Sequence, residues 1–192
     1  MMPQASPFDW SASPAAEQIE YLRGLTPESF HRALVEYDWA LAPEPVLGWA
    51  MAQRGIDLCT ALSVFFNGDP GRFNYMPKLH VPEPYRGVTR VLDNICLRVN
   101  SGFYLIYPGK IPSCQHRLSK WLSYQQADRD EGRRGRWMLD ERILDPMLQD
   151  DLRLPRDQAP MNKPRPSLWR DLLSPLIGLG VDRDVLKYKD RL

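Results

Sequence analysis

The feature that most constrains the fold is an apolar stretch between Gly55 and Gly68. Its large side chains recur at helical spacing on one side and smaller apolar residues fill the other; it contains Leu58, Ala61, Leu62, Phe65 and Phe66, with Cys59 and Val64 opposite. A helix that is apolar nearly all round is typical of a buried position. The sequence therefore predicts a central core helix that begins at an Asp57 cap, with other helices packed around it.

Proline and capping residues indicate where the helices before this stretch begin. Ser13-Pro14, Thr26-Pro27 and Pro43-Glu44-Pro45 each precede apolar residues at helical spacing. After the central helix, the most regular apolar stripe in the chain predicts a helix from Arg86 to Asn100. Residues 103–107 have strand propensity without a comparable second strand, which favours a packed extended segment.

The later part of the chain predicts further helices and then a linker. One helix is expected after Pro112 and another over residues 138–152, split at Asp145-Pro146 because proline breaks the helical hydrogen bonding. Residues 153–166 contain several prolines, which indicates an extended linker. Those prolines are Pro155, Pro160, Pro164 and Pro166.

The expected fold class is all-α, a compact domain of seven to nine helices over residues 13–152 with a C-terminal helical appendage. Residues 167–192 form that appendage, and their apolar face is too large to stay in water. We expect this arm to pack on its own domain or on a second copy, which would make the protein a homodimer. The face consists of Leu168, Trp169, Leu172, Leu173, Leu176 and Ile177.

Charge and composition exclude several broad classes of function. The 25 basic and 24 acidic residues leave a formal net charge of +1, so no whole-protein field attracts nucleic acid or an anionic membrane. The N-terminal residues lack a signal-peptide pattern, and no apolar run approaches the length of a membrane span. We therefore expect a cytoplasmic protein without a membrane partner, whose three cysteines are buried free thiols.

Motifs for cofactors, metals and common catalytic groups are missing from the sequence. It contains no Gly-x-Gly-x-x-Gly, no Walker loop and no Gly-x-Ser-x-Gly. Cys114 and His116 are the closest pair of metal-ligand types, but two residues apart on a helix they point to different sides. We expect no cofactor and no metal, and the sequence identifies no catalytic residue.

Five polar and aromatic residues form a candidate ligand-binding set: Tyr37, Asp38, Trp39, Asp57 and Thr60. An acid at one helix end, opposite an acid at a helix start, can line a cleft with two carboxylates and aromatic walls. The structural alternative is that Asp38 and Asp57 accept backbone N–H groups at turns while Trp39 fills the core.

A second candidate is the charged stretch from Asp128 to Arg136, in which Arg133, Arg134 and Arg136 can meet a phosphate backbone. Acidic residues interleave with these arginines, and a mixed run gives little field once salt screens it. The composition favours a solvated connection between helices, so nucleic-acid binding is the weaker alternative.

The residues Tyr37-Asp38-Trp39 and Cys59-Thr60-Ala61-Leu62, followed by Phe65-Phe66, resemble an uncharacterised bacterial domain family. Its members pair a Tyr-Asn-Trp-like triplet with a Cys-Asp-x-x-Thr-Ala-Leu-like helix, and the resemblance covers about residues 30–107. This chain has Asp38 where the family has Asn, and it has Asp57 before the cysteine. The resemblance implies a small helical bacterial domain and transfers no catalytic residue.

Three functions remain open from the sequence. The first is a non-enzymatic protein-interaction or regulatory domain of the immunity-protein kind, favoured by the missing catalytic motifs. The second is an enzyme or small-ligand-binding protein that uses a cleft near Asp38 and Asp57. The third is nucleic-acid binding through residues 129–136.

Overall fold

The computed structural model describes residues 8–107, 110 and 112–148. Over these residues the chain forms seven α-helices and four short 3₁₀ helices, without a named strand. The predicted all-α class is therefore confirmed. The linker predicted at 153–166, the arm predicted at 167–192 and the homodimer that depends on it lie outside the described residues.

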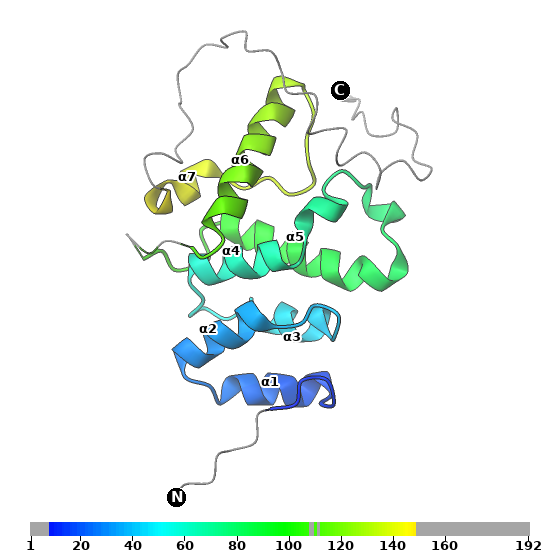
Figure 1. Ribbon diagram of the computed structural model, residues 1–192, viewed down its shortest axis with the longest axis vertical. Helices are drawn as coiled ribbons and strands as arrows, with labels where there is room; N and C mark the ends of the chain where they lie inside the picture. Colours follow the sequence, from blue (N-terminus) through cyan, green and yellow to red (C-terminus); the bar gives the residue numbers. More distant parts are fainter. Residues whose placement is uncertain (1–7, 108–109, 111, 149–192) are drawn as a thin grey trace, which may run out of the picture.

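The helices follow one another along the long axis of the molecule, with α1 at one end and α6 and α7 at the other (Figure 1). The elements are α1 (Ala15–Arg23), α2 (Pro27–Glu36), α3 (Pro43–Ala50), α4 (Leu58–Asn67), η1 (Pro70–Phe73), η2 (Lys78–His80), η3 (Glu83–Tyr85), α5 (Arg86–Asn100), α6 (Gln115–Asp130), α7 (Glu141–Leu144) and η4 (Asp145–Met147).

Side-chain caps fix the starts of two helices as predicted. The Ser29 backbone N–H donates to the Thr26 hydroxyl at 3.3 Å, and the Thr60 N–H donates to the Asp57 carboxylate at 3.1 Å. The cap predicted at Ser13 is wrong, because α1 begins one residue later and Pro14 occupies the cap position without a side-chain acceptor. Each side-chain cap stabilises its helix by about 0.5–2 kcal/mol.

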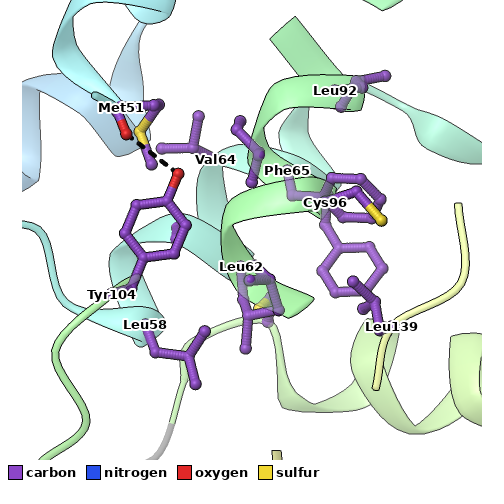
Figure 2. Close-up of a cluster of buried hydrophobic side chains, with 14 of the residues drawn as sticks. Met51, Leu58, Leu62, Val64, Phe65, Leu92, Cys96, Tyr104 and Leu139 are labelled. Atoms are coloured by element: carbon purple, nitrogen blue, oxygen red, sulfur yellow. Dashed lines mark hydrogen bonds between the residues drawn. The ribbon is translucent and has the colours of Figure 1, made fainter. Parts of the chain in front are cut away.

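The central helix of the prediction is α4, and every residue from Leu58 to Phe66 is buried. Phe65 of α4 lies toward Leu92 and Cys96 of α5, and Val64 lies toward Met51, in one buried cluster (Figure 2). Removing one such leucine or phenylalanine from water stabilises the fold by about 1.5–3 kcal/mol. The prediction of a core helix surrounded by other helices is therefore confirmed.

The segment after α5 packs in extended form, as predicted. The Leu58 N–H donates to the Leu105 carbonyl at 2.8 Å, and the Leu105 N–H donates to the Ile56 carbonyl at 3.0 Å. The Tyr104 hydroxyl donates to the Met51 carbonyl at 3.1 Å in the core (Figure 2). These bonds fasten the segment to the N-terminal end of α4 and to the C-terminal end of α3.

After α6 the chain turns back along the body before it enters α7 (Figure 1). The Gln125 side chain holds this return, because it accepts from the Leu139 N–H at 2.7 Å and donates to the Leu139 carbonyl at 3.1 Å. The helix predicted from residue 138 therefore begins only at Glu141. Its predicted split at Pro146 is confirmed, since α7 gives way to η4 at Asp145.

Candidate functional site

The candidate ligand set from the sequence is divided between the two ends of α4. A Cβ added at Gly68 would lie 2.6 Å from the Trp39 ring, so Trp39 packs on the C-terminal end of α4. Asp57 caps the N-terminal end, and the ten residues of α4 span about 15 Å. The structure therefore does not bring Asp38 and Asp57 together in one cleft.

Tyr37 and Asp38 make local structural contacts. The buried Tyr37 hydroxyl donates to Gln18 Oε1 at 2.8 Å and accepts from the Ala42 N–H at 3.2 Å. Burial raises the pKa of Tyr37. The exposed Asp38 carboxylate accepts from the Ala40 N–H at 2.8 Å, as an aspartate in a turn does. The structural reading of these two residues therefore accounts for their contacts.

Asp57 and Thr60 come together with two residues that the sequence analysis did not select, His31 and Lys110. The Thr60 hydroxyl donates to Asp57 Oδ2 at 2.6 Å and is hydrogen-bonded to His31 Nδ1. Lys110 Nζ lies 3.0 Å from the same Asp57 oxygen. Helices α2 and α4 and the loop after α5 thus each contribute to one polar cluster, which we call the Asp57 cluster.

The protons in the Asp57 cluster follow from the hydrogen bonds. The single hydroxyl proton of Thr60 points to Asp57, so His31 Nδ1 must carry the proton that it donates to Thr60. Burial alone would raise the pKa of Asp57, but hydrogen bonds from Thr60 and Lys110 outweigh it, and the pKa is lowered. The cluster therefore holds a carboxylate at neutral pH and links it through Thr60 to a half-exposed imidazole.

The Asp57 cluster opens to solvent beside exposed apolar side chains. The side chains of His31 and Lys110 are 41% and 44% exposed, whereas that of Asp57 is only 12% exposed. Leu105 and Tyr107 are also exposed, and Lys110 Nζ lies 5.8 Å from the centre of the Tyr107 ring. The acid is thus shielded, and its partners face the solvent.

A groove runs between the C-terminal half of α6 and the returning chain up to α7. Its volume is about 890 Å³, and we call it the arginine groove. Its lining is mostly polar and consists of Asn100, Gln125, Arg129, Arg133, Arg134, Met138, Leu139, Asp140, Glu141 and Arg142.

Of the three arginines in the candidate nucleic-acid set, Arg133 and Arg134 line the arginine groove. Arg136 does not, because its guanidinium makes two hydrogen bonds to the Asp93 carboxylate, at 2.9 and 2.8 Å. Its side chain is only 13% exposed. Arg136 therefore serves the fold and is withdrawn from any polyanion at the surface.

The other groove arginines differ in whether an acid neutralises them. Arg129 is paired with Glu141, and Arg133 lies 3.6 Å from Asp128 and 3.1 Å from Glu131. Within the described ranges, Arg134 and Arg142 have no ion pair. Among the described residues, the groove therefore carries two arginines without an ion pair, from two different segments of the chain.

A set of hydrogen bonds around Asp93 and Asn74 fixes one end of the groove wall. The Trp137 indole N–H donates to Asp93 at 2.8 Å, and the Trp137 backbone N–H donates to Asn74 Oδ1 at 3.1 Å. Gly135 passes so close to Asn74 that an added Cβ would lie 2.3 Å from its amide nitrogen. The chain between the groove residues Arg134 and Met138 is therefore held in one position against Asn74 and Asp93.

Two leucines that the sequence analysis did not select stand out in solvent beside this wall. Leu79 is 90% exposed and Leu97 is 69% exposed, and we call the area around them the leucine surface. Lys78 Nζ lies 3.8 Å from Asp93 Oδ2, so the Lys78 side chain reaches from η2 to α5. Leu97 follows Asp93 by one helical turn and precedes the groove residue Asn100 by three positions, so the Leu97 part of the leucine surface adjoins the arginine groove.

The buried thiols of the sequence prediction are confirmed: Cys59, Cys96 and Cys114 are all buried and free. Over residues 8–148, as far as the structure describes them, no three His, Cys, Asp or Glu side chains are grouped to hold a metal ion. No helix in this same part of the chain is both long and apolar enough to cross a membrane.

The fold and these surfaces define an all-α domain with a shielded acid at one end of its core helix and an exposed leucine surface beside a groove. No family model, curated protein or solved structure matches the chain. Membership of the uncharacterised bacterial family therefore stays a prediction.

Proposed function

We propose that the protein is a non-enzymatic protein-interaction domain of a regulatory, immunity-like kind, and that the leucine surface is its contact with the partner. The observation that carries this proposal is the exposure of Leu79 and Leu97, at 90% and 69%, on η2 and α5, which an ion pair between Lys78 and Asp93 connects. Covering one leucine side chain contributes about 1.5–3 kcal/mol. Two exposed leucines that one partner covers would therefore supply the apolar centre that a protein interface needs.

The leucine surface is held in position before any partner arrives. Val81, two residues after Leu79, is buried, and the Arg72 guanidinium lies 4.2 Å from the centre of the Tyr85 ring. Leu97 lies on α5, a 15-residue helix whose opposite face is apolar and buried in the core. A surface fixed by such contacts loses little conformational entropy on binding, which favours affinity.

Site-specific photo-crosslinking tests the proposal in the cells that make the protein. A photoreactive phenylalanine analogue replaces Leu79, Leu97 or, as a control, the exposed Arg32 on α2. We expect one protein adduct of defined mass from both leucine positions and none from Arg32. Equal labelling from all three positions, or no adduct from either leucine, would contradict the proposal.

The same experiment separates a different partner from a second copy of the chain. A homodimer through residues 167–192 stays a proposal, and it predicts an adduct of twice the chain mass that disappears when those residues are deleted. A cytoplasmic location is proposed with it, because three buried free thiols suit a reducing compartment.

A second candidate function is small-ligand binding, or catalysis, at the Asp57 cluster. The observation that favours it is the chain of hydrogen bonds from the shielded Asp57 through Thr60 to the half-exposed His31. A ligand bound at His31 or Lys110 would perturb these hydrogen bonds. A ligand screen by thermal shift, repeated on the Lys110→Ala variant, tests this candidate. Compounds that raise the melting temperature of both proteins equally would place the ligand elsewhere.

A further inference from the structure

We propose that the arginine groove binds an acidic segment of the protein partner, beside the contact at the leucine surface. This inference rests on the proposed function, and it names the chemistry of the partner segment that lies next to the leucine surface. It starts from the two groove arginines that lack an ion pair in the described part of the chain, Arg134 and Arg142. Both line the groove, so a ligand inside it meets both charges.

The two arginines come from two different segments of the chain that lines the groove. Arg134 lies in the chain that returns from α6, and Arg142 lies in α7. A guanidinium can bind a carboxylate through two parallel hydrogen bonds, which fixes orientation as well as charge. Two such groups in one groove fit a segment that carries more than one carboxylate.

The wall between them is already formed. The Asn100 side chain donates to the Met138 carbonyl at 2.7 Å and accepts from the Asp140 N–H at 2.9 Å. The half-buried Met138 adds an apolar contact to the groove lining. A peptide can therefore place carboxylates on the arginines and an apolar side chain on Met138 or Leu97.

The charges favour a protein segment over a nucleic acid. A phosphate backbone carries closely spaced charges and gains affinity from a row of unpaired cations. Here Arg129 and Arg133 are neutralised by acids, Arg136 is bound to Asp93, and Asp140 and Glu141 lie in the groove lining. Two isolated positive charges among carboxylates match a few acidic side chains better than a polyanion.

Fluorescence anisotropy with defined probes tests the inference on the full chain. The probes are a labelled peptide of about ten residues that alternates Glu and Leu, the same peptide with Gln for Glu, and a single-stranded DNA of about the same length. The variant Arg134→Ala/Arg142→Ala is compared with Arg32→Ala/Arg54→Ala, which removes the same charge from exposed arginines elsewhere. We expect the Glu peptide to bind about tenfold more weakly to the groove variant, and less than about twofold more weakly to the control variant.

Several outcomes would overturn the inference. They are equal binding of the Glu and Gln peptides, equal loss in the control variant, and tighter binding of the DNA than of the Glu peptide. To separate this inference from the proposed function, the photo-crosslinking with the photoreactive residue at position 97 is repeated in the Arg134→Ala/Arg142→Ala variant. A failed peptide test with the Leu97 adduct intact refutes only the acidic chemistry, whereas a missing Leu97 adduct in the native chain refutes the proposed function itself.

Discussion

Asp57 combines a helix cap with the centre of a charged cluster. Asparagine also caps helices, so Asp57→Asn keeps the backbone bond and removes the charge that faces Lys110. The pKa of Asp57 is lowered from its usual 3.8, so its charge stabilises the fold fully above that pH, and the gain is lost as pH falls through the lowered pKa.

We expect Asp57→Asn to be less stable than the native chain by about 1 kcal/mol at pH 6, with the difference shrinking below the usual aspartate pKa. Urea unfolding across a pH series measures this. If the free energies of unfolding of the native chain and of Asp57→Asn differ by the same amount at every pH down to strong acid, the Asp57 charge contributes nothing to stability.

Gly135 and Gly48 give opposite predictions for the same substitution. In Gly135→Ala the new methyl group displaces the Asn74 amide, which is buried and bonded to Trp137, and we expect a loss of about 1–3 kcal/mol. In Gly48→Ala nothing lies within 4 Å of the new methyl group, and the residue is inside α3, so we expect a gain of about 0.5–1 kcal/mol. Thermal denaturation of both variants checks the signs, and a neutral Gly135→Ala would argue against the close packing on Asn74.

The thiols should be inert in the folded protein. Burial raises the pKa of Cys59 and of Cys96 to about 11, and it raises the pKa of Cys114 as well. The thiolate is the reactive form, so we expect no fast reaction with a disulfide reagent at pH 8 and three reactive thiols after unfolding without reductant. A fast-reacting thiol in the folded protein, or fewer than three in the unfolded one, would disagree with this picture.

At the scale of elements, Asp93 joins α5, η2 and the chain after α6. Its carboxylate accepts two hydrogen bonds from Arg136 and one from the Trp137 indole. Asp93→Ala leaves a largely buried guanidinium without its counter-ion, and we expect a loss of about 2–4 kcal/mol. The exposed Glu36→Ala on α2 is the control and should change stability by less than about 0.5 kcal/mol. Urea unfolding measures both variants. If Asp93→Ala and Glu36→Ala lower the free energy of unfolding equally, Asp93 does not have this structural role.

Helices with a local signal were predictable from the sequence, and contacts across elements were not. The apolar stripe of α5 and the caps at Thr26 and Asp57 are written in neighbouring residues, so pattern reading finds them. The partners of Asp57 come from 26 residues before it and 53 residues after it, at His31 and Lys110. No periodicity in either segment points to that meeting.

The arginine stretch shows the same limit. The sequence presents Arg133, Arg134 and Arg136 as similar. Arg133 meets acids from its own stretch, whereas Arg136 meets Asp93, which lies 43 residues away, and only the folded chain shows that pairing. Leu79 and Leu97 were missed as well. Leu97 lies at helical spacing from Asp93 and Asn94 on the polar face of α5, so the periodicity of that helix could have found it, whereas no pattern in the short η2 segment marks Leu79 as exposed.

At the scale of the whole molecule, two polar regions lie on different parts of the fold. The Asp57 cluster lies at the start of α4 and joins it to α2, whereas the arginine groove lies between α6 and α7 beside the leucine surface. A ligand at the first region and a protein partner at the second can therefore be tested by independent substitutions.

The central claim is that Leu79 and Leu97 contact one protein partner together. The most direct measurement is the yield of the adduct from a photoreactive residue at position 79, with Leu97 present or replaced in Leu97→Ser. Because Leu97 is exposed, the substitution should leave the melting temperature nearly unchanged. We predict that the adduct yield at limiting partner falls about tenfold, since the apolar contact of one leucine is lost. An unchanged yield with an intact fold would contradict the claim.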